Sequence, residues 1–377
     1  MPASPDRCDV AIIGGGPSGA AAALSLRQIR PALRVILVEA SRYHKWRVGE
    51  SISPGCLQLL DSLGCGERFR AEGFLESFGT RSAWGAELPY DHEYLFHTQG
   101  SGWQVDRVRF DAMLAESAEA ADVEVRREAR LTGSEWAEEQ GWNLEIREGD
   151  TAVAMEARFV VDASGRAAAF AMRQGAERIV ADRLAGAFMR FRFPAGSAPA
   201  DTRTFVEAAE DGWWYSSIAP DSEGACAVVA WMSDSDLIRG RNLATADAWM
   251  SHLVRSGFTA ARVASGVPDM AVEVRTAQSQ RLTQVTGPGW VAAGDAASTF
   301  DPLSSQGILK ALRSGKLASF VAVDFLEGRV ESLQRYENLV AGEFQQYLAG
   351  RTWYYRQERR WPDSPFWSRR HSTQEAA

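Results

Sequence analysis

Residues 9–39 read DVAIIGGGPSGAAAALSLRQIRPALRVILVE. The first five form a short apolar run, typical of a buried parallel strand, and residues 20–30 have the composition of a helix. A second apolar run at 34–38 ends at Glu39. Strand, glycine-rich turn, helix, strand and acidic residue thus follow one another within about 30 residues, which is the order of the dinucleotide-binding fingerprint. This order predicts an α/β domain that binds a nucleotide.

The glycines of this turn have separate roles in a nucleotide site. Gly14 permits the tight turn, Gly16 lets the backbone approach a pyrophosphate, and Gly19 lets the helix pack closely on the strand. The helix that follows presents free N–H groups and partial positive charge to the phosphates. Glu39 can accept hydrogen bonds from ribose hydroxyls, and because its charge would repel a 2′-phosphate, NADP is not expected at this site. No second G-x-G-x-x-G occurs in the chain, so only one nucleotide has a dedicated site.

The composition is that of an ordinary globular protein. The chain has 377 residues, enough for two domains or one large discontinuous domain. Its 41 Lys and Arg against 49 Asp and Glu give a net charge of −8, which argues against non-specific binding of nucleic acid. No apolar run approaches the roughly 18 residues of a membrane span, and the N-terminus lacks the pattern of a signal peptide. We therefore expect a cytoplasmic protein with neither nucleic-acid nor membrane partners.

Cysteine and histidine spacings give no indication of a metal site. The four cysteines, Cys8, Cys56, Cys65 and Cys226, form no C-x-x-C pair, and the five histidines are widely scattered. In a cytoplasmic protein such cysteines are expected to be reduced and mostly buried. The 13 tryptophans have two interpretations, either as core residues or as the lining of a flat pocket for a planar ligand.

The middle of the chain changes to the alternating pattern of half-buried strands. In residues 189–193, apolar positions alternate with arginines. Residues 213–218 and 225–231 also have the composition of strands. We therefore expect an antiparallel sheet over roughly 183–275, with one face free to cover a ligand.

The last third of the chain returns to the first pattern. A buried strand is expected at 289–293, leading into a Gly-Asp pair, and a long apolar helix is expected over 307–326. A tail at 353–367 is aromatic and basic.

Five blocks occur in an order that resembles one known superfamily. In chain order they are the glycine turn at 14–19, RVGES at 47–51, VDRVRFDAML at 105–114, VVDASG at 160–165 and AGDA at 293–296. Together they resemble the FAD-dependent monooxygenase superfamily, which includes the para-hydroxybenzoate hydroxylases and the tryptophan halogenases. The resemblance extends from about residue 9 to residue 326.

The resemblance implies an α/β fold with a Rossmann-type FAD-binding domain, an antiparallel-sheet substrate domain and a helical C-terminal tail. The implied boundaries are 1–75, 100–182 and 276–330 for the discontinuous FAD-binding domain, 76–99 and 183–275 for the substrate domain, and 331–377 for the tail.

The resemblance also implies how FAD is held. Asp295 would accept hydrogen bonds from the ribitol chain, and Arg107 would contact the flexible middle of the cofactor. Residues 304–308 would form the N-terminus of the last long helix and face the N1–C2=O edge of the flavin, where a helix N-terminus stabilises the negative charge of the reduced form. Pro302 would fix this loop. The predicted cofactor-binding residues are Gly14, Gly16, Pro17, Ser18, Gly19, Glu39, Arg47, Ser51, Arg107, Asp295, Pro302, Ser305, Gly307 and Ile308.

In this superfamily an electron-rich ring attacks a flavin C4a-hydroperoxide, and a nearby carboxylate can remove a proton or orient an indole N–H. Glu50 and Asp301 are the candidates for that catalytic carboxylate. A structural hydrogen bond for Glu50 and a helix cap for Asp301 are the alternatives. The substrate pocket is expected to include Trp84, Trp213, Tyr215 and Ile218.

The GES sequence at 49–51 and the segment at 211–220 resemble the halogenase-like branch, yet halogenation is not expected. Halogenases carry a lysine near the position of residues 77–84, where this chain has none, and a glutamate where this chain has Ser304. The GWQVDRVRFD segment at 102–111 and the aromatic tail instead resemble a halogenase-like subgroup that matures quinone-cofactor oxidases and dehydrogenases. That subgroup hydroxylates a tryptophan within a protein substrate.

The predicted function is FAD-dependent hydroxylation of an electron-rich aromatic ring, such as a tryptophan side chain in a peptide or protein client, with dioxygen as co-substrate. NAD(P)H would reduce the FAD directly or through a separate flavin reductase. The alternatives are a small-molecule indole or phenol hydroxylase, a flavin reductase of the geranylgeranyl-reductase type, and a non-catalytic flavin-binding escort of a client protein.

Overall fold

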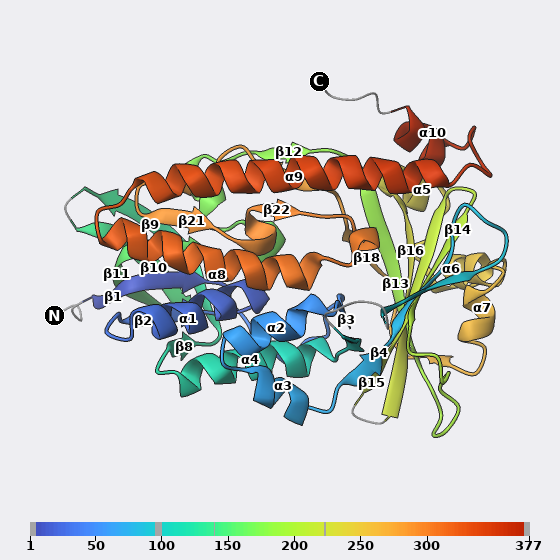
Figure 1. The fold of residues 1–377 in the computed structure, drawn as a ribbon, viewed down its shortest axis with the longest axis horizontal. Helices are drawn as coiled ribbons and strands as arrows, with labels where there is room; N and C mark the ends of the chain where they lie inside the picture. The colour runs from blue at the N-terminus through green and yellow to red at the C-terminus, as the bar shows by residue number, and fades with distance from the viewer. Residues whose placement is uncertain (1–4, 95–99, 139, 222–223, 373–377) are drawn as a thin grey trace.

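The computed structural model describes residues 5–94, 100–138, 140–221 and 224–372. Two eight-stranded sheets lie at opposite ends of the long axis of the molecule, and helices pack on and between them (Figure 1). The sheet built from the fingerprint segment occupies the left half of Figure 1, and the sheet from the middle of the chain occupies the right half.

The first sheet has a parallel core. β1 pairs in parallel with β2 on one side and with β11 on the other, and β2 pairs in parallel with β8. β10 extends the sheet by pairing antiparallel with the first half of β11. The strands are β20 (Thr286–Gly287), β21 (Trp290–Ala292), β11 (Thr151–Asp162), β1 (Asp6–Ile13), β2 (Val35–Val38), β8 (Glu124–Arg126), β9 (Ala129–Ala137) and β10 (Gly141–Glu148).

Five helices belong to this half of the molecule. They are α1 (Pro17–Ile29), α2 (Gly55–Ser62), α3 (Gly66–Ala71), α4 (Arg107–Ala120) and α8 (Gly307–Leu326). α1 packs against both α4 and α8, with α2 packed on α8 and α3 on α4. At Gly315 of α8, an added Cβ would overlap the carbonyl oxygen of Ser18, so glycine lets the two helices cross closely. The predicted helix over 307–326 is confirmed.

The second sheet is antiparallel except where β14 runs parallel to β5. Its strands are β17 (Val267–Pro268), β13 (Leu184–Arg192), β16 (Gly224–Asp234), β15 (Gly212–Asp221), β14 (Thr204–Ala209), β5 (Gly79–Ala83), β6 (Tyr90–Glu93) and β18 (Glu273–Thr276). Helices α5 (Ser235–Gly240), α6 (Ala246–Leu253) and α7 (Thr259–Arg262) accompany it. A core around Trp214, Trp231 and Trp249 includes the apolar residues of α6.

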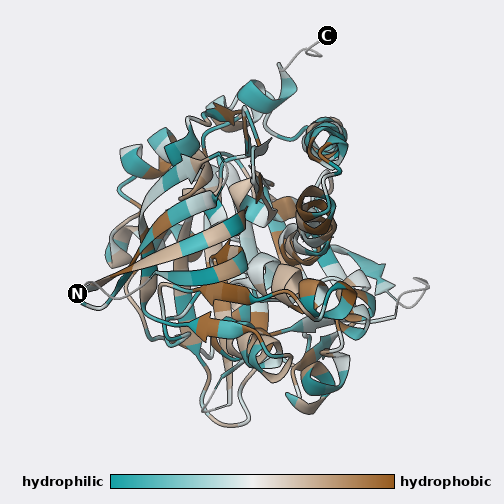
Figure 2. Cartoon of the chain, turned by 90° about the vertical axis from the view of Figure 1, so that its left-hand side faces the viewer, coloured by the Kyte–Doolittle hydropathy of each residue, from teal (hydrophilic) through white to brown (hydrophobic). Residues whose placement is uncertain are grey.

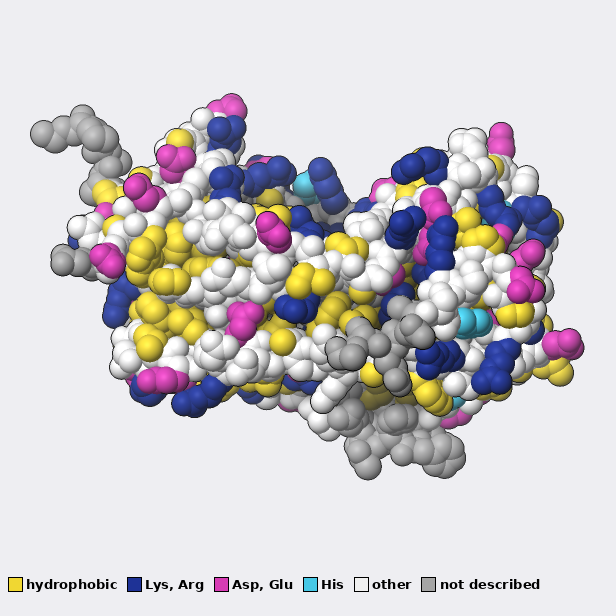
Figure 3. Space-filling view, turned by 90° about the horizontal axis from the view of Figure 1, so that it is seen from above, with side chains coloured by type: hydrophobic (Ala, Val, Ile, Leu, Met, Phe, Trp, Pro, Cys, Tyr) yellow, Lys and Arg dark blue, Asp and Glu magenta, His cyan; other side chains and the backbone are white. Residues whose placement is uncertain are grey.

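Short elements connect the two halves. Two three-stranded sheets consist of β12 (Arg178–Val180), β19 (Gln280–Leu282) and β22 (Ser298–Thr299), and of β3 (Ser51–Ile52), β7 (Gly102–Gln104) and β4 (Leu75–Ser77). The described residues also include the 3-10 helices η2 (Gly165–Ala167), η3 (Ala171–Gln174), η4 (Gly294–Ala296) and η5 (Pro302–Ser304). Figure 3 shows the surface hollowed between the two halves, with Lys or Arg side chains on both sides of the hollow.

The C-terminal part is helical. α9 (Glu331–Gln357) runs along the top of both halves in Figure 1, and α10 (Pro365–His371) follows it. In the end-on view of Figure 2, α9 is mixed teal and brown, whereas α8 beneath it is mainly brown, as expected for a helix that α9 covers. The aromatic stretch 353–367 is therefore not one element, because it contains the end of α9, a loop and the start of α10.

The predicted fold class is confirmed. A Rossmann-type sheet, an antiparallel sheet and a helical C-terminal region are all present. The hairpin of β5 and β6 joins the antiparallel sheet although it lies far from it in sequence. Residues 76–77 belong instead to β4, and residues 95–99 of the expected segment 76–99 lie outside the described residues.

Candidate flavin site

Among the four glycines between the end of β1 and the start of α1, only Gly16 is open; Gly14, Gly15 and Gly19 are tight. Gly14 has a φ of +108°, and an added Cβ there would overlap the carbonyl oxygen of Ala163. At Gly19, an added Cβ would overlap the carbonyl oxygen of Gly14, which explains the close approach of α1 to β1. Beside Gly16, in contrast, no atom lies within 4 Å of an added Cβ. The open space at Gly16 is what a phosphate needs in order to approach the backbone.

The carboxylate of Glu39, at the end of β2, is buried beside this turn. It accepts hydrogen bonds from the backbone N–H groups of Gly15, at 2.8 Å, and Ser41, at 2.9 Å. Arg47 lies 3.3 Å from the same carboxylate. The hydroxyl of Tyr43 donates to the carbonyl of Gly15 at 3.0 Å, a contact that motif reading did not predict. Glu39 therefore lies at the edge of the glycine turn, where a ribose would be bound.

The late Gly-Asp pair meets the N-terminus of α1. An added Cβ at Gly294 would come within 2.8 Å of Ser18, and the backbone of Gly294 has a φ of +63°. The hydroxyl of Ser18 is buried and has no hydrogen-bond partner among the described residues. The side chain of Asp295 is 40% exposed and forms an ion pair of 3.2 Å with Lys310.

These features fit a bound flavin nucleotide. The open backbone at Gly16, the unpartnered hydroxyl of Ser18 and the partly exposed carboxylate of Asp295 supply the types of group that a pyrophosphate and a ribitol chain require. Pro17 begins the helix whose N-terminus faces the same turn.

Arg107, at the start of α4, is held by protein groups on several sides. Its guanidinium binds Asp111 through two hydrogen bonds of 3.0 Å and donates to the carbonyl of Val48 at 2.9 Å. Arg47 also lies 3.4 Å from Asp111. Asp111 is buried and orients both arginines, and it was not among the predicted cofactor-binding residues. The spacing of four residues on one helix is the signal that would have revealed it.

The loop before α8 has a more detailed structure than the resemblance implied. α8 begins at Gly307, whereas Pro302 and Ser304 form η5 and Ser305 has a φ of +50°. Residues 304 and 305 are therefore not part of the helix, and α8 is followed by the longer α9. The first turn of α8 still offers the N–H groups that the resemblance assigned to the flavin, with Ile308 buried behind them.

Glu50 and Asp301, the two candidate catalytic carboxylates, lie in different surroundings. Glu50 is buried and accepts hydrogen bonds from Tyr215, at 2.6 Å, and from Ser217 of β15. Asp301 is buried, caps η5 by accepting from the N–H of Leu303 at 2.9 Å, and contacts α9. Burial raises the pKa of Asp301. Both alternatives, a structural hydrogen bond and a helix cap, correspond to contacts in the structure, and neither contact tests a catalytic role.

The expected pocket residues do not share one face of the second sheet. Tyr215 lies beside Glu50, and its hydroxyl is also 3.0 Å from Ser51. Trp213 and Trp84 pack with residues of α9 and α10 in a buried aromatic cluster. Ile218 belongs to the core on the opposite side, with Trp214 and α6. Alternation along β15 separates positions 213 and 215 from position 218. Burial, followed by the effect of Glu50, raises the pKa of Tyr215 well above its usual value, so its hydroxyl stays protonated.

The remaining polar side chains show no metal site. Within the described residues, no group of three or more His, Cys, Asp or Glu side chains could hold a metal ion. All four cysteines are buried and unpaired, and burial raises the pKa of each thiol to about 12. No described helix combines the length and hydrophobicity that a membrane crossing needs.

Comparison with known proteins identifies the family. Residues 7–313 match the family described as the FAD binding domain. LodB of Marinomonas mediterranea, named as an FAD-dependent oxidoreductase, is 30% identical over 370 residues, which cover 97% of both chains.

Two solved structures share the fold. The myxobacterial chondrochloren halogenase CndH has a TM-score of 0.86 at 24% identity, over 97% of this chain and 86% of that one. The peptidyl tryptophan dihydroxylase QhpG, described as essential for tryptophylquinone cofactor biogenesis, has a TM-score of 0.75 at 23% identity, over 98% of this chain and 80% of that one. The family match and the glycine, Glu39 and Asp295 geometry agree. The chain therefore belongs to the FAD-binding domain family and is a flavin-dependent enzyme.

Proposed function

We propose that the enzyme is an FAD-dependent monooxygenase that hydroxylates an electron-rich aromatic ring, namely a tryptophan side chain in a peptide or protein client. The observation that carries this proposal is a polar cluster in which Tyr215 and Ser217 of β15 donate hydrogen bonds to Glu50. Glu50 directly follows Gly49, whose carbonyl accepts from Arg107. The cluster supplies a buried proton acceptor. The similarity in fold to a peptidyl tryptophan dihydroxylase supports the same chemistry.

The lysines favour hydroxylation over halogenation. The chain has only three, Lys45, Lys310 and Lys316, and β5 has none. Lys310 is buried and donates to the carbonyl of Ser298, and burial lowers its pKa. Lys316 donates to Ser62 at 3.0 Å on the surface of the first half. β5 occupies the position at which halogenases carry a lysine, and β5 contains no lysine.

When bound, FAD supplies the activation of dioxygen and the transfer of one oxygen atom to the ring, and NAD(P)H or a separate reductase supplies the electrons. Hydroxylation replaces a ring C–H by C–OH, so the substituted carbon must lose a proton. Tyr215 can accept this proton while passing its own to Glu50, because its hydroxyl donates to that carboxylate at 2.6 Å. Ser217 donates to the same oxygen atom of Glu50 and keeps the carboxylate in place.

A macromolecular client is supported by the outer face of α9. Trp353 is 60% exposed and Tyr354 is 52% exposed, and their rings are in edge-on contact at 5.1 Å. Exposed aromatic residues next to arginine are typical of the anchoring points of protein interfaces. Arg359 is exposed just beyond this pair, whereas Arg360 is bound to Glu358. An acidic client segment would be attracted to this surface despite the net charge of −8.

The test is an oxygen-incorporation assay with isotope-labelled dioxygen, reduced FAD, and either a tryptophan-bearing peptide or free tryptophan. A product heavier by one or two labelled oxygen atoms, formed faster from the peptide, is the expected result. Preferred turnover of free tryptophan would make the enzyme a small-molecule hydroxylase. Substrate reduction without incorporated oxygen would identify a reductase of the geranylgeranyl type, and flavin binding without any turnover would indicate an escort protein.

A further inference from the structure

Three side chains of α9, spaced four residues apart, contact the loop that precedes α8. The ring of Tyr347 stacks on Phe300 with centroids 4.0 Å apart and an interplanar angle of 2°, and its hydroxyl accepts from the N–H of Asp301 at 2.7 Å. Arg351 lies 3.4 Å from the carboxylate of Asp301. The hydroxyl of Tyr355 donates to the same carboxylate at 2.7 Å. The spacing places all three on one face of the helix.

Asp301 transmits these contacts to the turn that begins α8. Its other carboxylate oxygen accepts from the N–H of Leu303, and so fixes η5 directly before Gly307. Asp301 is 1% exposed, and Arg351 is held from behind by Asp182 at 3.1 Å. The conformation of the loop expected to face the flavin therefore depends on α9, a helix that lies beyond the matched family region at 7–313.

Tyr355 also contacts the antiparallel sheet. Its hydroxyl accepts a hydrogen bond from the indole Nε1–H of Trp213 at 3.1 Å. Trp213 lies on β15, the strand whose Tyr215 and Ser217 hold Glu50. One hydroxyl donates once and accepts up to twice, so Tyr355 can make both bonds at the same time. Burial, reinforced by Asp301, raises the pKa of Tyr355 well above its usual value, so the donor proton is retained.

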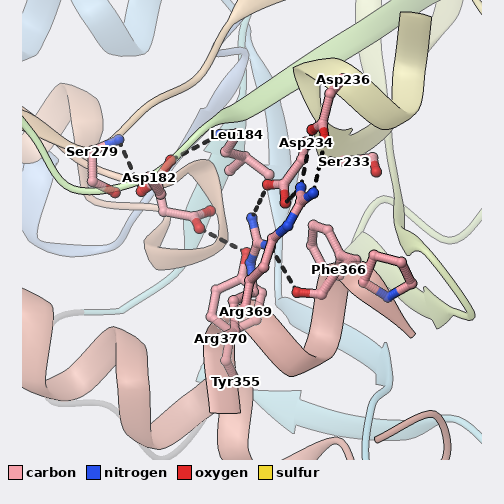
Figure 4. Close-up of polar contacts among 12 residues, drawn as sticks. Asp182, Leu184, Ser233, Asp234, Asp236, Ser279, Tyr355, Phe366, Arg369 and Arg370 are labelled. Atoms are coloured by element: carbon pink, nitrogen blue, oxygen red, sulfur yellow. Dashed lines mark hydrogen bonds and ion pairs between the residues drawn. The ribbon is translucent and has the colours of Figure 1, made fainter. Parts of the chain in front are cut away.

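Packing encloses the ring of Tyr355, and the hydroxyl adds two directed contacts to that packing. Tyr355 is 1% exposed, and its ring packs against Trp84, Phe366 and Trp367. Figure 4 shows Tyr355 close to Arg370 and Phe366 and below Asp182. Apolar packing is not directional, so the two hydrogen bonds of the hydroxyl are what specify its register with Trp213 and Asp301.

We propose that Tyr355 is a positioning residue whose hydroxyl couples β15 of the antiparallel sheet to Asp301, and thereby fixes the turn before α8 against the flavin. The inference rests on the placement of the flavin beside that turn, and not on the identity of the ring that is oxidised.

The test compares Tyr355→Phe with Tyr336→Phe. Tyr336 is a matched control because it is also buried on α9, and its hydroxyl makes one hydrogen bond, of 3.0 Å, to the carbonyl of Ala292 rather than to Asp301. The readouts are the visible circular dichroism of bound FAD, its reduction potential and its dissociation constant. We expect Tyr355→Phe to shift the dichroism and the potential and to weaken FAD binding by about tenfold, since the bond it loses is made to a charged group. Tyr336→Phe should leave all three unchanged.

Identical flavin readouts for Tyr355→Phe and Tyr336→Phe at equal melting temperature would overturn the proposal. If Tyr355→Phe does not fold, Trp213→Phe decides instead, because it removes the bond from β15 to the same hydroxyl; its melting temperature reports separately on the packing that the smaller ring loses. A shift of the dichroism in Trp213→Phe supports the coupling, and an unchanged spectrum refutes it. These readouts need no substrate, so a protein that shows the shift but hydroxylates nothing would contradict only the proposed function.

Discussion

The hydroxyl of Tyr215 donates a hydrogen bond of 2.6 Å to Glu50, and thereby joins β15 to the loop that follows β2. Glu50 is 3% exposed, and its carboxylate also binds Ser217 and the N–H of Gly49, the latter at 3.0 Å. A buried carboxylate that accepts a hydrogen bond from a hydroxyl can serve as the final acceptor of a proton relayed through that hydroxyl. The same contacts could serve only to hold the loop, and substitution separates the two roles.

Glu50→Gln should reduce kcat about 100-fold or more while FAD stays bound, because the amide keeps the size of the side chain but cannot accept the proton. Tyr215→Phe should lower kcat less, since water can replace the hydroxyl in the relay. Steady-state oxidation of a tryptophan peptide measures both. Glu210→Gln, at an exposed carboxylate in the turn after β14, is the control. Unchanged kcat in Glu50→Gln with altered stability would show that Glu50 is structural.

Gly16→Val should yield a folded protein without flavin. No atom lies within 4 Å of an added Cβ at Gly16, so the side chain enters only the space that the pyrophosphate needs. At Gly19 an added Cβ would overlap the backbone of Gly14, so Gly19→Val should instead lower the melting temperature. Flavin release on denaturation and thermal melting of the apo proteins measure the two effects. Retention of FAD by Gly16→Val would show that the cofactor does not approach this turn.

The fold was predictable wherever a local pattern determines it. The glycine turn requires a positive φ at Gly14 and close packing at Gly19. Few arrangements other than strand, tight turn, helix and strand meet both requirements, so β1, α1 and β2 could be predicted. α8 was predictable to its boundaries because apolar residues recur throughout it, from Ile308 to Leu326. α9 was not, because most of its surface is polar and only its contacts with α8 and the second sheet reveal its buried face.

The site was predictable only in part, because tertiary contacts determine the rest. Period-two alternation along β15 already implies that Ile218 cannot face the same side as Trp213 and Tyr215, so that error could have been avoided. The packing of Trp84 against Trp367 and Tyr355 joins segments that are distant in the sequence, and no local pattern indicates it. Likewise, no sequence motif indicates the contact between Asp301 and Tyr355.

Chloride or bromide should not be incorporated into any product. The expectation follows from the absence of lysine on β5 and from Ser304 in place of the halogenase glutamate. Product masses from an indole or peptide, measured with and without halide in the presence of a flavin reductase, provide the test. A halogenated product that requires the enzyme would mean that another group, such as Lys45, takes the part of the missing lysine.

His252 should make the second sheet less stable in mild acid. Burial, reinforced by Arg241 and Arg255, lowers the pKa of His252 to about 4. The ring packs between Trp214 and Trp231. In the unfolded chain its pKa is about 6.5, so as the pH falls from about 6.5 to about 4 the unfolded state gains a proton that the folded state does not. The loss is at most about 3 kcal/mol.

Denaturant unfolding of the wild type and of His252→Phe at pH 7 and pH 5 isolates this contribution from that of other titrating groups. The wild type should lose more stability over that interval than the variant does. Equal losses would show that His252 is protonated in the folded protein as readily as in the unfolded chain.

Arg359 and Arg360 should differ in their effect on a protein client. Arg359 is exposed at the end of α9, so Arg359→Ala should lower kcat/KM for an acidic tryptophan peptide by about three- to tenfold, chiefly through the association rate, with unchanged FAD content. Arg360 binds Glu358, which in turn accepts from the N–H of Gly85 at 2.8 Å and so ties α9 to the hairpin of β5 and β6. Arg360→Ala should therefore lower the melting temperature, and any effect on turnover should follow the fraction folded.

Raising the salt concentration should reduce the difference between the wild type and Arg359→Ala, because screening weakens the attraction of an acidic segment. If Arg359→Ala turns over peptide and free tryptophan as the wild type does at low salt, the client does not dock at the end of α9.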